Sequence, residues 1–512
     1  LLTSNRPTPG ESFAANEFDP LPTGEADEVP FDIPADASTE GEAGANEPDE
    51  GPVEQFPTAR AARPDLPATQ TESDKDPDRL ARVFLEPYSI DGLYTLRFWR
   101  GRWYAWTKDA GRYVEVEREA FTARLWRTIK NEFDRIATEA FANANPDKPP
   151  PKTLEVTDSL LKNVTGAIKA RTILEEKTNA PCWVEGSPQA DANRDPRDFI
   201  AMRNGLFDVR AWLSGLPCLS RLTPRWFSVS RLPFDYDPVA RSPLWERFLT
   251  TSLGVEDERS MLAEWFGYCL TPDMSKQKFL MLDGEGNNGK SVVCAALEAL
   301  LGSENVSHVM LEHFNGRFNL NQTLGKLANI AAEVGELEKA NEAALKSFVS
   351  GDVMTFDRKN QSLIDSAPTA RLVFSTNNRP RFSDRSKGIW RRMLLLPMNY
   401  AVPDGEKIEN LDKPWFWASH ASAIFNWALG GLARLRSTGR FTEPATSAAA
   451  LSDYRAEMNP AMRFLEEFFE ATGDPEDWVR KDDAYNTYKE WSKANGYQAL
   501  CDANFGKEVR RM

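Results

Sequence analysis

The chain has 512 residues, 41% of them hydrophobic, which is enough for roughly three or four domains with substantial cores. Its formal net charge of −15 arises almost wholly in residues 1–80, which hold 19 acidic and 5 basic side chains; the remainder holds 58 acidic and 57 basic residues, so a nucleic-acid partner is not excluded. No apolar run approaches 18 residues, and five scattered cysteines with only three histidines indicate neither a disulfide framework nor a zinc site. We therefore expect a cytoplasmic protein, in a bacterial or host cytosol, with no membrane partner.

Residues 1–78 are rich in Pro, Glu, Asp, Gly and Ala and hold 12 of the 34 prolines. Such a segment cannot bury enough apolar surface to offset its chain entropy, so we expect a disordered acidic tail. A partner-binding segment with Phe13, Phe18 and Phe31 as apolar contacts is the alternative. The sequence begins with Leu1 and no methionine, which is compatible with a fragment of a longer chain.

Residues 79–240 predict an α+β domain. Periodicity predicts helices over 80–85, 120–141 and 157–174, and strand-and-turn segments in 200–209 and 222–238. Residues 93–106 (LYTLRFWRGRWYAW) alternate like a β-hairpin that turns at Gly101. Its interleaved arginines and aromatic residues could stack on and neutralise single-stranded DNA; we favour the plainer interpretation, a hairpin with a buried aromatic face and solvated arginines.

A helical lead-in is expected over 241–275 and an α/β core over 276–405. Residues 279–283 (FLMLD) indicate a buried strand, and the glycine-rich run after them (GEGNNGKS) has the full spacing G-x-x-x-x-G-K-[ST] before a predicted helix over 292–301. Strand, phosphate loop and helix in this order predict a nucleotide site. Its candidate binding residues are Gly284, Glu285, Gly286, Asn287, Asn288, Gly289, Lys290 and Ser291.

Each residue type in this loop suits phosphate binding. Glycines let backbone N–H groups close around a phosphate, and the helix N-terminus adds partial positive charge. We expect Lys290 to contact the β- and γ-phosphates and the Ser291 hydroxyl to coordinate Mg²⁺. The run also satisfies the dinucleotide fingerprint G-x-G-x-x-G, but the Lys-Ser pair argues against that interpretation. A glycine turn before a core helix is the structural alternative.

Three blocks precede the loop: Asn204 to Asp208 (NGLFD), Leu232 to Pro238 (LPFDYDP) and Trp265 to Leu270 (WFGYCL). In this order, and in front of GEGNNGKS, they resemble the phage and plasmid primase-helicase family, which belongs to the superfamily 3 helicases and is related to the poxvirus primase-helicase. The similarity runs from about Asp78 to the C-terminus. It implies an AAA+-like P-loop NTPase core, ATP and Mg²⁺ as cofactors, and a hexameric homo-oligomer around DNA.

The resemblance places a water-polarising acid at Glu333, directly after a predicted buried strand over 327–332 (LANIAA). Ala332 lacks the second carboxylate that many P-loop ATPases carry, so Mg²⁺ is expected at Ser291 and Glu333 together with water. Glu336 is the rival to Glu333, because the acidic run 333–338 also suits a solvated turn.

Candidate DNA contacts also come from the resemblance. Lys346 matches a lysine of the family's middle motif, and residues 355–361 (TFDRKNQ) occupy the place of a hairpin that touches DNA in the ring's channel. Arg358 and Lys359 are then candidate phosphate contacts, although basic residues in a polar turn are commonly just solvated.

Asn377 ends a third apolar strand over 371–376, and the resemblance makes it the γ-phosphate sensor; an Asn that starts a turn is the alternative. Residues 384–397 (DRSKGIWRRMLLLP) hold the candidate arginine finger for a neighbouring subunit. Arg391 and Arg392 are adjacent on a predicted strand and would point opposite ways, so we expect one of them to serve and favour Arg392; a surface pair is the alternative. Such a finger requires a head-to-tail interface that closes into a ring.

The last two predicted regions are a helical region over 406–460 and a partial winged-helix DNA-binding domain over 461–512. Tyr485, Tyr488 and Trp491 are expected to form the core face of one helix. Basic residues within 507–511 are candidate DNA contacts, and the chain ends before any wing.

We therefore expect a multidomain α/β ATPase that works as a DNA helicase on single-stranded and forked DNA, in the replication of a phage, plasmid or other mobile element. The alternatives are an NTP-gated DNA-binding or assembly protein without unwinding, and an AAA-type protein remodeller. No acidic metal-binding cluster of a primase type is evident in the sequence, so primase activity would need an upstream domain.

Overall fold

The computed structural model describes residues 72–510 except 144–151, 185–192, 316–318, 333–341, 359–362, 383–386, 404, 406, 471, 473 and 475. Nearly all of the predicted acidic tail lies outside these residues. Residues 71–512 form one compact unit. None of the described helices is long and apolar enough to span a bilayer.

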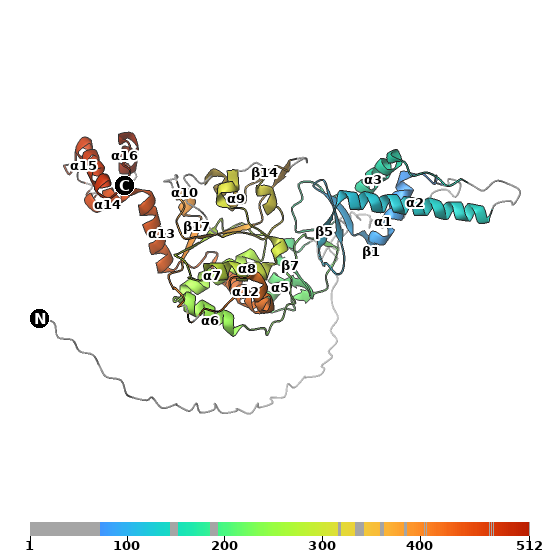
Figure 1. Ribbon diagram of the computed structural model, residues 1–512, viewed down its shortest axis with the longest axis horizontal. Coiled ribbons are helices and arrows are strands. Elements are labelled where there is room, and N and C mark those ends of the chain that lie inside the picture. Colours follow the sequence, from blue (N-terminus) through green and yellow to red (C-terminus); the bar gives the residue numbers. More distant parts are fainter. Residues whose placement is uncertain are drawn as a thin grey trace, which may run out of the picture. The chain divides into compact units, whose positions relative to one another are not determined.

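The first part of this unit packs helices on a small antiparallel sheet (Figure 1). Its elements are α1 (Pro77–Leu85), β1 (Ser89–Ile90), β2 (Leu93–Tyr94), β3 (Leu96–Trp99), β4 (Arg102–Trp106), β5 (Tyr113–Val116), α2 (Arg118–Ala142) and α3 (Asp158–Thr172). The predicted hairpin is confirmed as β3 and β4, joined at Arg100 and Gly101, both with positive φ. Trp99 and Trp103 are buried as expected, but Arg97 is also buried, so the arginines of this hairpin are not all solvated.

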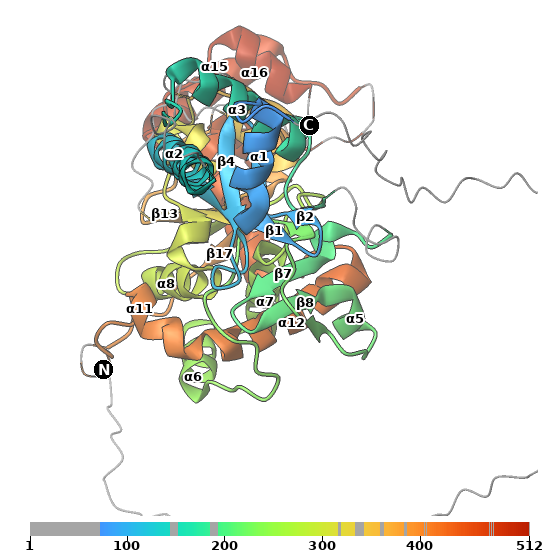
Figure 2. The same ribbon diagram turned by 90° about the vertical axis from the view of Figure 1, so that its right-hand side faces the viewer.

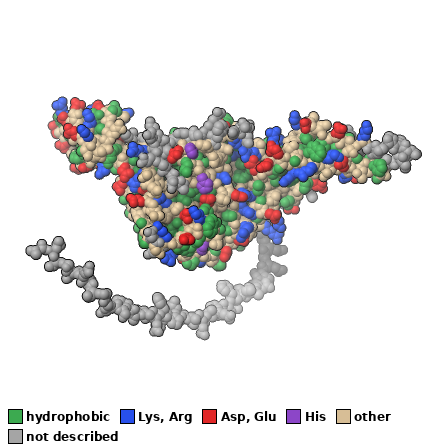
Figure 3. All heavy atoms as spheres, in the orientation of Figure 1, with side chains coloured by type: hydrophobic (Ala, Val, Ile, Leu, Met, Phe, Trp, Pro, Cys, Tyr) green, Lys and Arg blue, Asp and Glu red, His purple; other side chains and the backbone are tan. Residues whose placement is uncertain are grey.

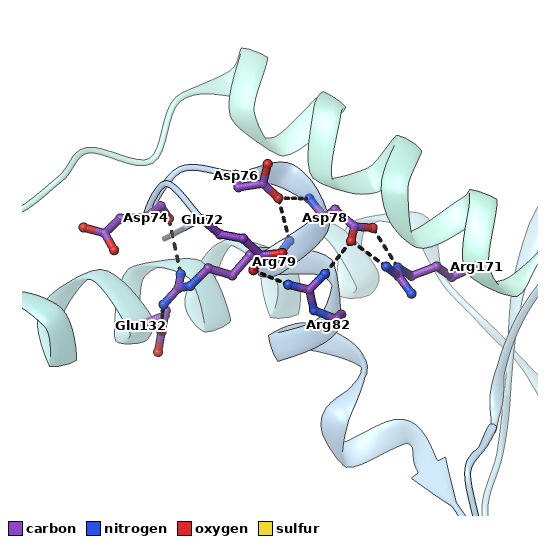
Figure 4. Close-up of polar contacts among 8 residues, drawn as sticks. All are labelled: Glu72, Asp74, Asp76, Asp78, Arg79, Arg82, Glu132 and Arg171. Atoms are coloured by element: carbon purple, nitrogen blue, oxygen red, sulfur yellow. Dashed lines mark hydrogen bonds and ion pairs between the residues drawn. The ribbon is translucent and has the colours of Figure 1, made fainter. Parts of the chain in front are cut away.

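Ion pairs connect α1 to the two longer helices, as Figure 4 shows. Asp78 accepts hydrogen bonds from Arg171 of α3 at 2.5 and 2.8 Å and from Arg82 of its own helix at 2.5 Å. The hydrogen bond from Arg171 holds the pKa of Asp78 below its usual value. Arg79 pairs with Glu132 of α2. The apolar face of α1, with Leu80 and Phe84, shares a core with Leu96 of β3 and Trp103 of β4. The ion pairs therefore fix the helix that covers one face of the hairpin.

Short strands and three helices lead from this region into the core. They are β6 (Cys182–Trp183), β7 (Phe199–Met202), β8 (Gly205–Asp208), α5 (Val209–Leu213), β9 (Leu219–Ser220), β10 (Trp226–Phe227), α6 (Pro243–Ser252) and α7 (Glu256–Cys269). The helices α6 and α7 lie within residues 241–275, for which the sequence predicted a helical lead-in. In α7 the residues Met261, Leu262, Trp265 and Phe266 are buried, because this helix lies beneath the central sheet.

The central sheet has five parallel strands in the order β12-β13-β16-β11-β17. Their bounds are β11 (Phe279–Asp283), β12 (Val306–Ser307), β13 (Ala328–Ala332), β16 (Arg371–Thr376) and β17 (Met393–Pro397). After β11 the chain crosses through α8 (Lys290–Leu301) to the far edge at β12 and returns through β13 and β16. It then places β17 on the other side of β11, so the strand order reverses at β11. In open α/β sheets, ligands bind outside the carboxyl ends of the strands at such a switch point.

Both faces of the sheet are covered, which explains why its strands are continuously apolar. Leu280 and Leu282 of β11 face α7, α8 and α12 (Ala421–Thr438). Phe279 and Met281 face α9 (Glu342–Ser350), α10 (Lys387–Trp390) and α13 (Ala445–Met458). Figures 1 and 2 show α7, α8 and α12 together on one side of the sheet.

The remaining elements are the hairpin strands β14 (Met354–Phe356) and β15 (Ile364–Ser366) and the helices α11 (Pro414–Trp417), α14 (Pro460–Phe468), α15 (Lys481–Ala494) and α16 (Asp502–Val509). Helices α14 to α16 share a small core in which Tyr488 is fully buried and Tyr485 and Trp491 pack beside it, as the helical spacing predicted. Acidic and basic side chains are interspersed over the face shown in Figure 3.

Candidate nucleotide site

The glycine-rich loop, residues 284–289, lies at the carboxyl end of β11 and turns directly into α8. Asp283 accepts a backbone hydrogen bond from Met398, which follows β17, and Asn287 accepts one from Val402. The Asn288 amide donates to the Met398 carbonyl at 2.6 Å. The loop is therefore held against the segment after β17, with the N-terminus of α8 behind it.

Two of the three loop glycines are required by the packing of the loop itself. Gly284 has a φ of 154°, and a Cβ there would lie 2.2 Å from the Asn288 side chain. Gly289 has a φ of 87°, and a Cβ there would lie 2.9 Å from the Phe248 ring. A Cβ on Gly286 would meet nothing within 4 Å, so the folded loop itself does not require glycine there, and a role of Gly286 in the approach of the backbone to a phosphate stays a prediction.

The Lys290 ammonium is buried inside the loop. It donates to the carbonyls of Gly284 and Glu285 at 2.6 and 2.8 Å and to Asn288 Oδ1 at 2.9 Å. Burial lowers its pKa. A cation so placed, with the backbone N–H groups of a helix start beside it, is an arrangement suited to an anion, and we call this part of the loop, at the switch point of the sheet, the cradle. Ser291, the predicted Mg²⁺ ligand, is exposed at the start of α8.

The sheet brings Asn377 next to this loop. In the parallel register Asp283 pairs with Thr376, so Asn377 follows β16 where Gly284 follows β11, and its side chain is exposed at that edge. Ala332 at the end of β13 pairs with Ser375, so β13 also ends at this edge. Glu333, the predicted acid after β13, and its rival Glu336 lie outside the described residues. Within the described part of the chain, no three His, Cys, Asp or Glu side chains form a metal cluster.

An ion-pair network beside the loop was missed in the sequence analysis. Arg379 donates to Asp283 Oδ2 through Nε and Nη2 at 2.9 and 2.8 Å, and to Glu457 of α13 at 3.0 Å. Its guanidinium also lies 5.3 Å from the centre of the Tyr454 ring. Burial lowers the pKa of Arg379, but the hydrogen bonds and negative charges of Asp283 and Glu457 together outweigh burial, so the pKa is raised. The only sequence signal was a carboxylate directly before the loop and an arginine two residues after Asn377.

Two family models match parts of the chain. Residues 282–392, from β11 through the loop to the end of the arginine pair, match a family of unknown function (DUF5906). Residues 456–512 match the family described as poxvirus D5 protein-like.

The chain also resembles two viral proteins named as candidate helicases. It is 22% identical over 454 residues to L207/L206 of Acanthamoeba polyphaga mimivirus, covering 82% of this chain and 46% of the relative. It is 23% identical over 248 residues to 022R of Frog virus 3 (isolate Goorha), covering 42% of this chain and 24% of the relative. The poxvirus D5-like match and the two viral relatives support a primase-helicase family for this chain. It spans less than half the length of these two relatives.

Among solved structures, the C-terminal region of NrS-1 matches at 12% identity and a TM-score of 0.42, covering 76% of this chain and 78% of that chain. The resemblance stated from the sequence is supported by the poxvirus D5-like match and by the viral relatives, and the roles of individual residues stay predictions.

For the two arginines that the primase-helicase resemblance singled out, the prediction of a strand was wrong. Arg391 and Arg392 lie in the turn between α10 and β17, because β17 begins only at Met393. The Arg392 carbonyl accepts a hydrogen bond from the Phe279 N–H at 2.8 Å, so both arginines lie at the amino end of β11. The Arg392 side chain donates to Ser350 Oγ at 2.8 Å, and Arg391 is exposed.

The candidate DNA contacts that the resemblance suggested fall in three different places. Lys346, in α9, is 3.8 Å from Glu342 of the same helix. Arg358 follows β14 and is only 5% exposed; it donates to the Arg100 carbonyl of the N-terminal hairpin at 3.0 Å. Lys359 lies outside the described residues. A DNA contact by Lys346 or Arg358 stays a prediction.

Proposed function

We propose that the chain is an ATP-dependent DNA helicase of the superfamily 3 type, which acts in the replication of a virus, plasmid or other mobile element. The observation that carries the proposal is the cradle at the carboxyl end of β11, where the buried Lys290 ammonium stands inside the loop at the start of α8. The two viral relatives named as candidate helicases support DNA unwinding as the use of the nucleotide.

The residues of the loop fit a nucleoside triphosphate with Mg²⁺. Lys290 would exchange the two carbonyls it now contacts for phosphate oxygens, and the exposed Ser291 hydroxyl is free of steric cover at the helix start. Mg²⁺, when bound, neutralises charge on the β- and γ-phosphates. Asn377 would hold a γ-phosphate or water beside it, and Glu333 would orient the attacking water.

The location of Arg392 supports an assembly in which subunits complete one another's sites. The strand β11 separates Arg392 from the loop by five residues, or roughly 16 Å at about 3.3 Å per residue. An arginine at the amino ends of the strands therefore cannot reach a nucleotide at the carboxyl ends of the strands in its own subunit. A head-to-tail arrangement could bring it to a neighbour's nucleotide, and such an arrangement closes into a ring when the rotation permits.

The test is steady-state ATP hydrolysis with and without single-stranded DNA, on the wild type, Lys290→Ala and Lys276→Ala. Lys276 is a matched control, because its ammonium also donates to a backbone carbonyl, that of Gly439, but lies away from the loop. We expect hydrolysis that DNA stimulates in the wild type and in Lys276→Ala, and none above background in Lys290→Ala.

Strand separation on a forked duplex then tests the motor directly. Hydrolysis stimulated by DNA without unwinding would favour a nucleotide-gated DNA-binding protein, and hydrolysis indifferent to DNA would favour a protein remodeller. No hydrolysis by a folded, oligomeric wild type would refute the proposal.

A further inference from the structure

The turn that carries Arg391 and Arg392 is held by its backbone at the amino end of β11. The Arg391 carbonyl accepts a hydrogen bond from Lys278 Nζ at 2.7 Å, and the Arg392 carbonyl accepts one from the Phe279 N–H at 2.8 Å. The Arg392 N–H donates to the Ile389 carbonyl at 3.0 Å. Because the backbone is held in this way, the direction of the Arg392 cation is decided by the contacts of its side chain.

Two acceptors hold the Arg392 guanidinium. Its Nη1 donates at 2.7 Å to the carbonyl of Gly388, which lies in α10 four residues earlier. Its Nε and Nη2 both donate to Ser350 Oγ, at 3.3 and 2.8 Å. Ser350 is 42 residues away along the chain and is the last residue of α9, which packs beside α10 (Figure 1). Ser350 therefore connects the arginine to an element outside its own turn.

The end of α9 gives the Ser350 hydroxyl a defined place. Gly351, with a φ of 72°, donates its N–H to the Phe348 carbonyl, and the Asp352 N–H donates to the Ser347 carbonyl, both at 3.1 Å. These two bonds form the Schellman pattern, which closes a helix with a left-handed residue. Phe348 is fully buried, so the last turn of α9 is anchored in the core. The partial negative charge of a helix C-terminus also favours a guanidinium beside it.

These contacts leave part of the guanidinium available. The group has five N–H donors, one on Nε and two on each terminal nitrogen. Ser350 accepts from Nε and Nη2, and Gly388 accepts from Nη1, so these bonds leave one N–H on each terminal nitrogen. An arginine with a free N–H on both terminal nitrogens can contact two oxygens of one phosphate.

The charges around the guanidinium come from both signs. Burial, and then the charge of Arg391, lower the pKa of Arg392, while the charge of Asp352 acts in the opposite direction. Among the residues that the structure describes, the acceptors that hold Arg392 are a carbonyl and a hydroxyl. A phosphate that binds the two remaining N–H groups therefore displaces no carboxylate from these acceptor positions.

We propose that Ser350 is the positioning residue of Arg392. Its hydroxyl holds one side of the guanidinium and leaves the two remaining N–H groups for a phosphate of the nucleotide in a neighbouring subunit. The inference rests on the proposed function, in which Arg392 serves a site in trans. A cation that is held in place before the nucleotide arrives needs little reorganisation when charge develops on the transferred phosphate. Without the acceptor, the long side chain regains other rotamers and is less often directed at the phosphate.

Steady-state ATP hydrolysis by Ser350→Ala is the first measurement, with Ser437→Ala as the control. Ser437 also lies at the end of a helix, α12, and its hydroxyl donates to the Arg434 carbonyl at 2.9 Å, but α12 covers the opposite face of the sheet from α9. We expect Ser350→Ala to lower kcat by roughly 10- to 100-fold with KM unchanged, which is the effect of one hydrogen bond to a charged group. Ser437→Ala should hydrolyse ATP as the wild type does.

Mixed oligomers separate positioning of the arginine from a general loss of folding. In one mixture, Ser350→Ala is added to the Lys290→Ala subunit, which supplies the arginine. In the other, it is added to the Arg392→Ala subunit, which supplies the loop. Both mixtures hold the same substitutions in equal amounts, so a weakened fold would lower both activities alike. We expect the loss of roughly 10- to 100-fold only in the first mixture, relative to the same mixture without Ser350→Ala.

Equal losses in the two mixtures, or a wild-type kcat in Ser350→Ala, would overturn this role of Ser350 and leave the proposed function standing. If the mixture of Lys290→Ala and Arg392→Ala subunits recovers no activity while the wild type unwinds DNA, the inference fails together with the finger in trans, and the helicase remains. A folded wild type that hydrolyses no ATP would refute both the inference and the proposed function.

Discussion

Substituting the loop glycines by alanine tests the geometry of the cradle, because each change adds one methyl group and only the surroundings differ. At Gly284 the methyl would lie 2.2 Å from the Asn288 amide and 2.4 Å from the Met398 carbonyl, with φ at 154°. Neither atom can move away without breaking the hydrogen bond between the Asn288 amide and the Met398 carbonyl. At Gly286 the same methyl would enter open space.

The expected destabilisation follows from these contacts. Forcing an extra carbon into a packed site costs about 1–3 kcal/mol, and a backbone conformation that alanine disfavours adds about 1–3 kcal/mol. We expect Gly284→Ala to lose roughly 3 kcal/mol or more, which at about 1 °C per kcal/mol for a compact unit of this size lowers Tm by roughly 3 °C or more. Gly289→Ala is expected to lose about 1–2 kcal/mol of stability, mainly from forcing alanine into the left-handed conformation. The contact with Phe248 adds little, because the edge of that ring can shift. Gly286→Ala should stay within about 0.5 kcal/mol.

Thermal unfolding and titration with a fluorescent ATP analogue measure the two consequences separately. Gly284→Ala should lose stability and nucleotide affinity together. If Gly286→Ala keeps its Tm but binds nucleotide poorly, the space beside Gly286 is needed by the ligand rather than by the fold. A Tm loss in Gly286→Ala as large as that in Gly284→Ala would show that the contacts around Gly284 do not set the loop's stability.

Two further predictions concern arginines. Arg379→Gln leaves the nearly buried Asp283 carboxylate with a weaker partner. Removing the partner of a fully buried charge costs about 3–5 kcal/mol of stability, so we expect a loss of about 2 kcal/mol here and near-complete rescue of Tm in the double variant with Asp283→Asn. An unchanged Tm in Arg379→Gln would show that this pair does not stabilise the loop. Arg392→Ala should reduce hydrolysis by roughly 10³ to 10⁵ with ATP binding retained, and Arg391→Ala should not. Mixing Arg392→Ala with Lys290→Ala subunits should restore part of the activity, because one subunit then supplies the loop and the other the arginine; no recovery in mixed oligomers would refute a finger in trans.

Local patterns carried the prediction of the nucleotide loop and the hairpin. The apolar run before the loop, the spacing of its glycines and the Lys-Ser pair all lie within 13 consecutive residues, 279–291, so short-range geometry is enough to define a strand, a turn and a helix start. The hairpin at Gly101 was predictable for the same reason, since alternation and a turn residue determine it. Arg391 and Arg392 were misassigned because a short helix and a turn interrupt an apolar pattern that otherwise suits a strand.

The sequence by itself therefore determined two things: that a loop with the phosphate-binding pattern lies between a buried strand and a helix, and which family the chain resembles. The tertiary structure decided what surrounds that loop. Arg379 meets Asp283 across 96 residues of chain, and Asn377 lies beside the loop only because β16 is the neighbour of β11. Strand order also separates Arg392 from its own loop and places Lys326 beside the N-terminal hairpin. Periodicity along a chain reports which residues are buried, but not which strands pair, and these contacts depend on the pairing.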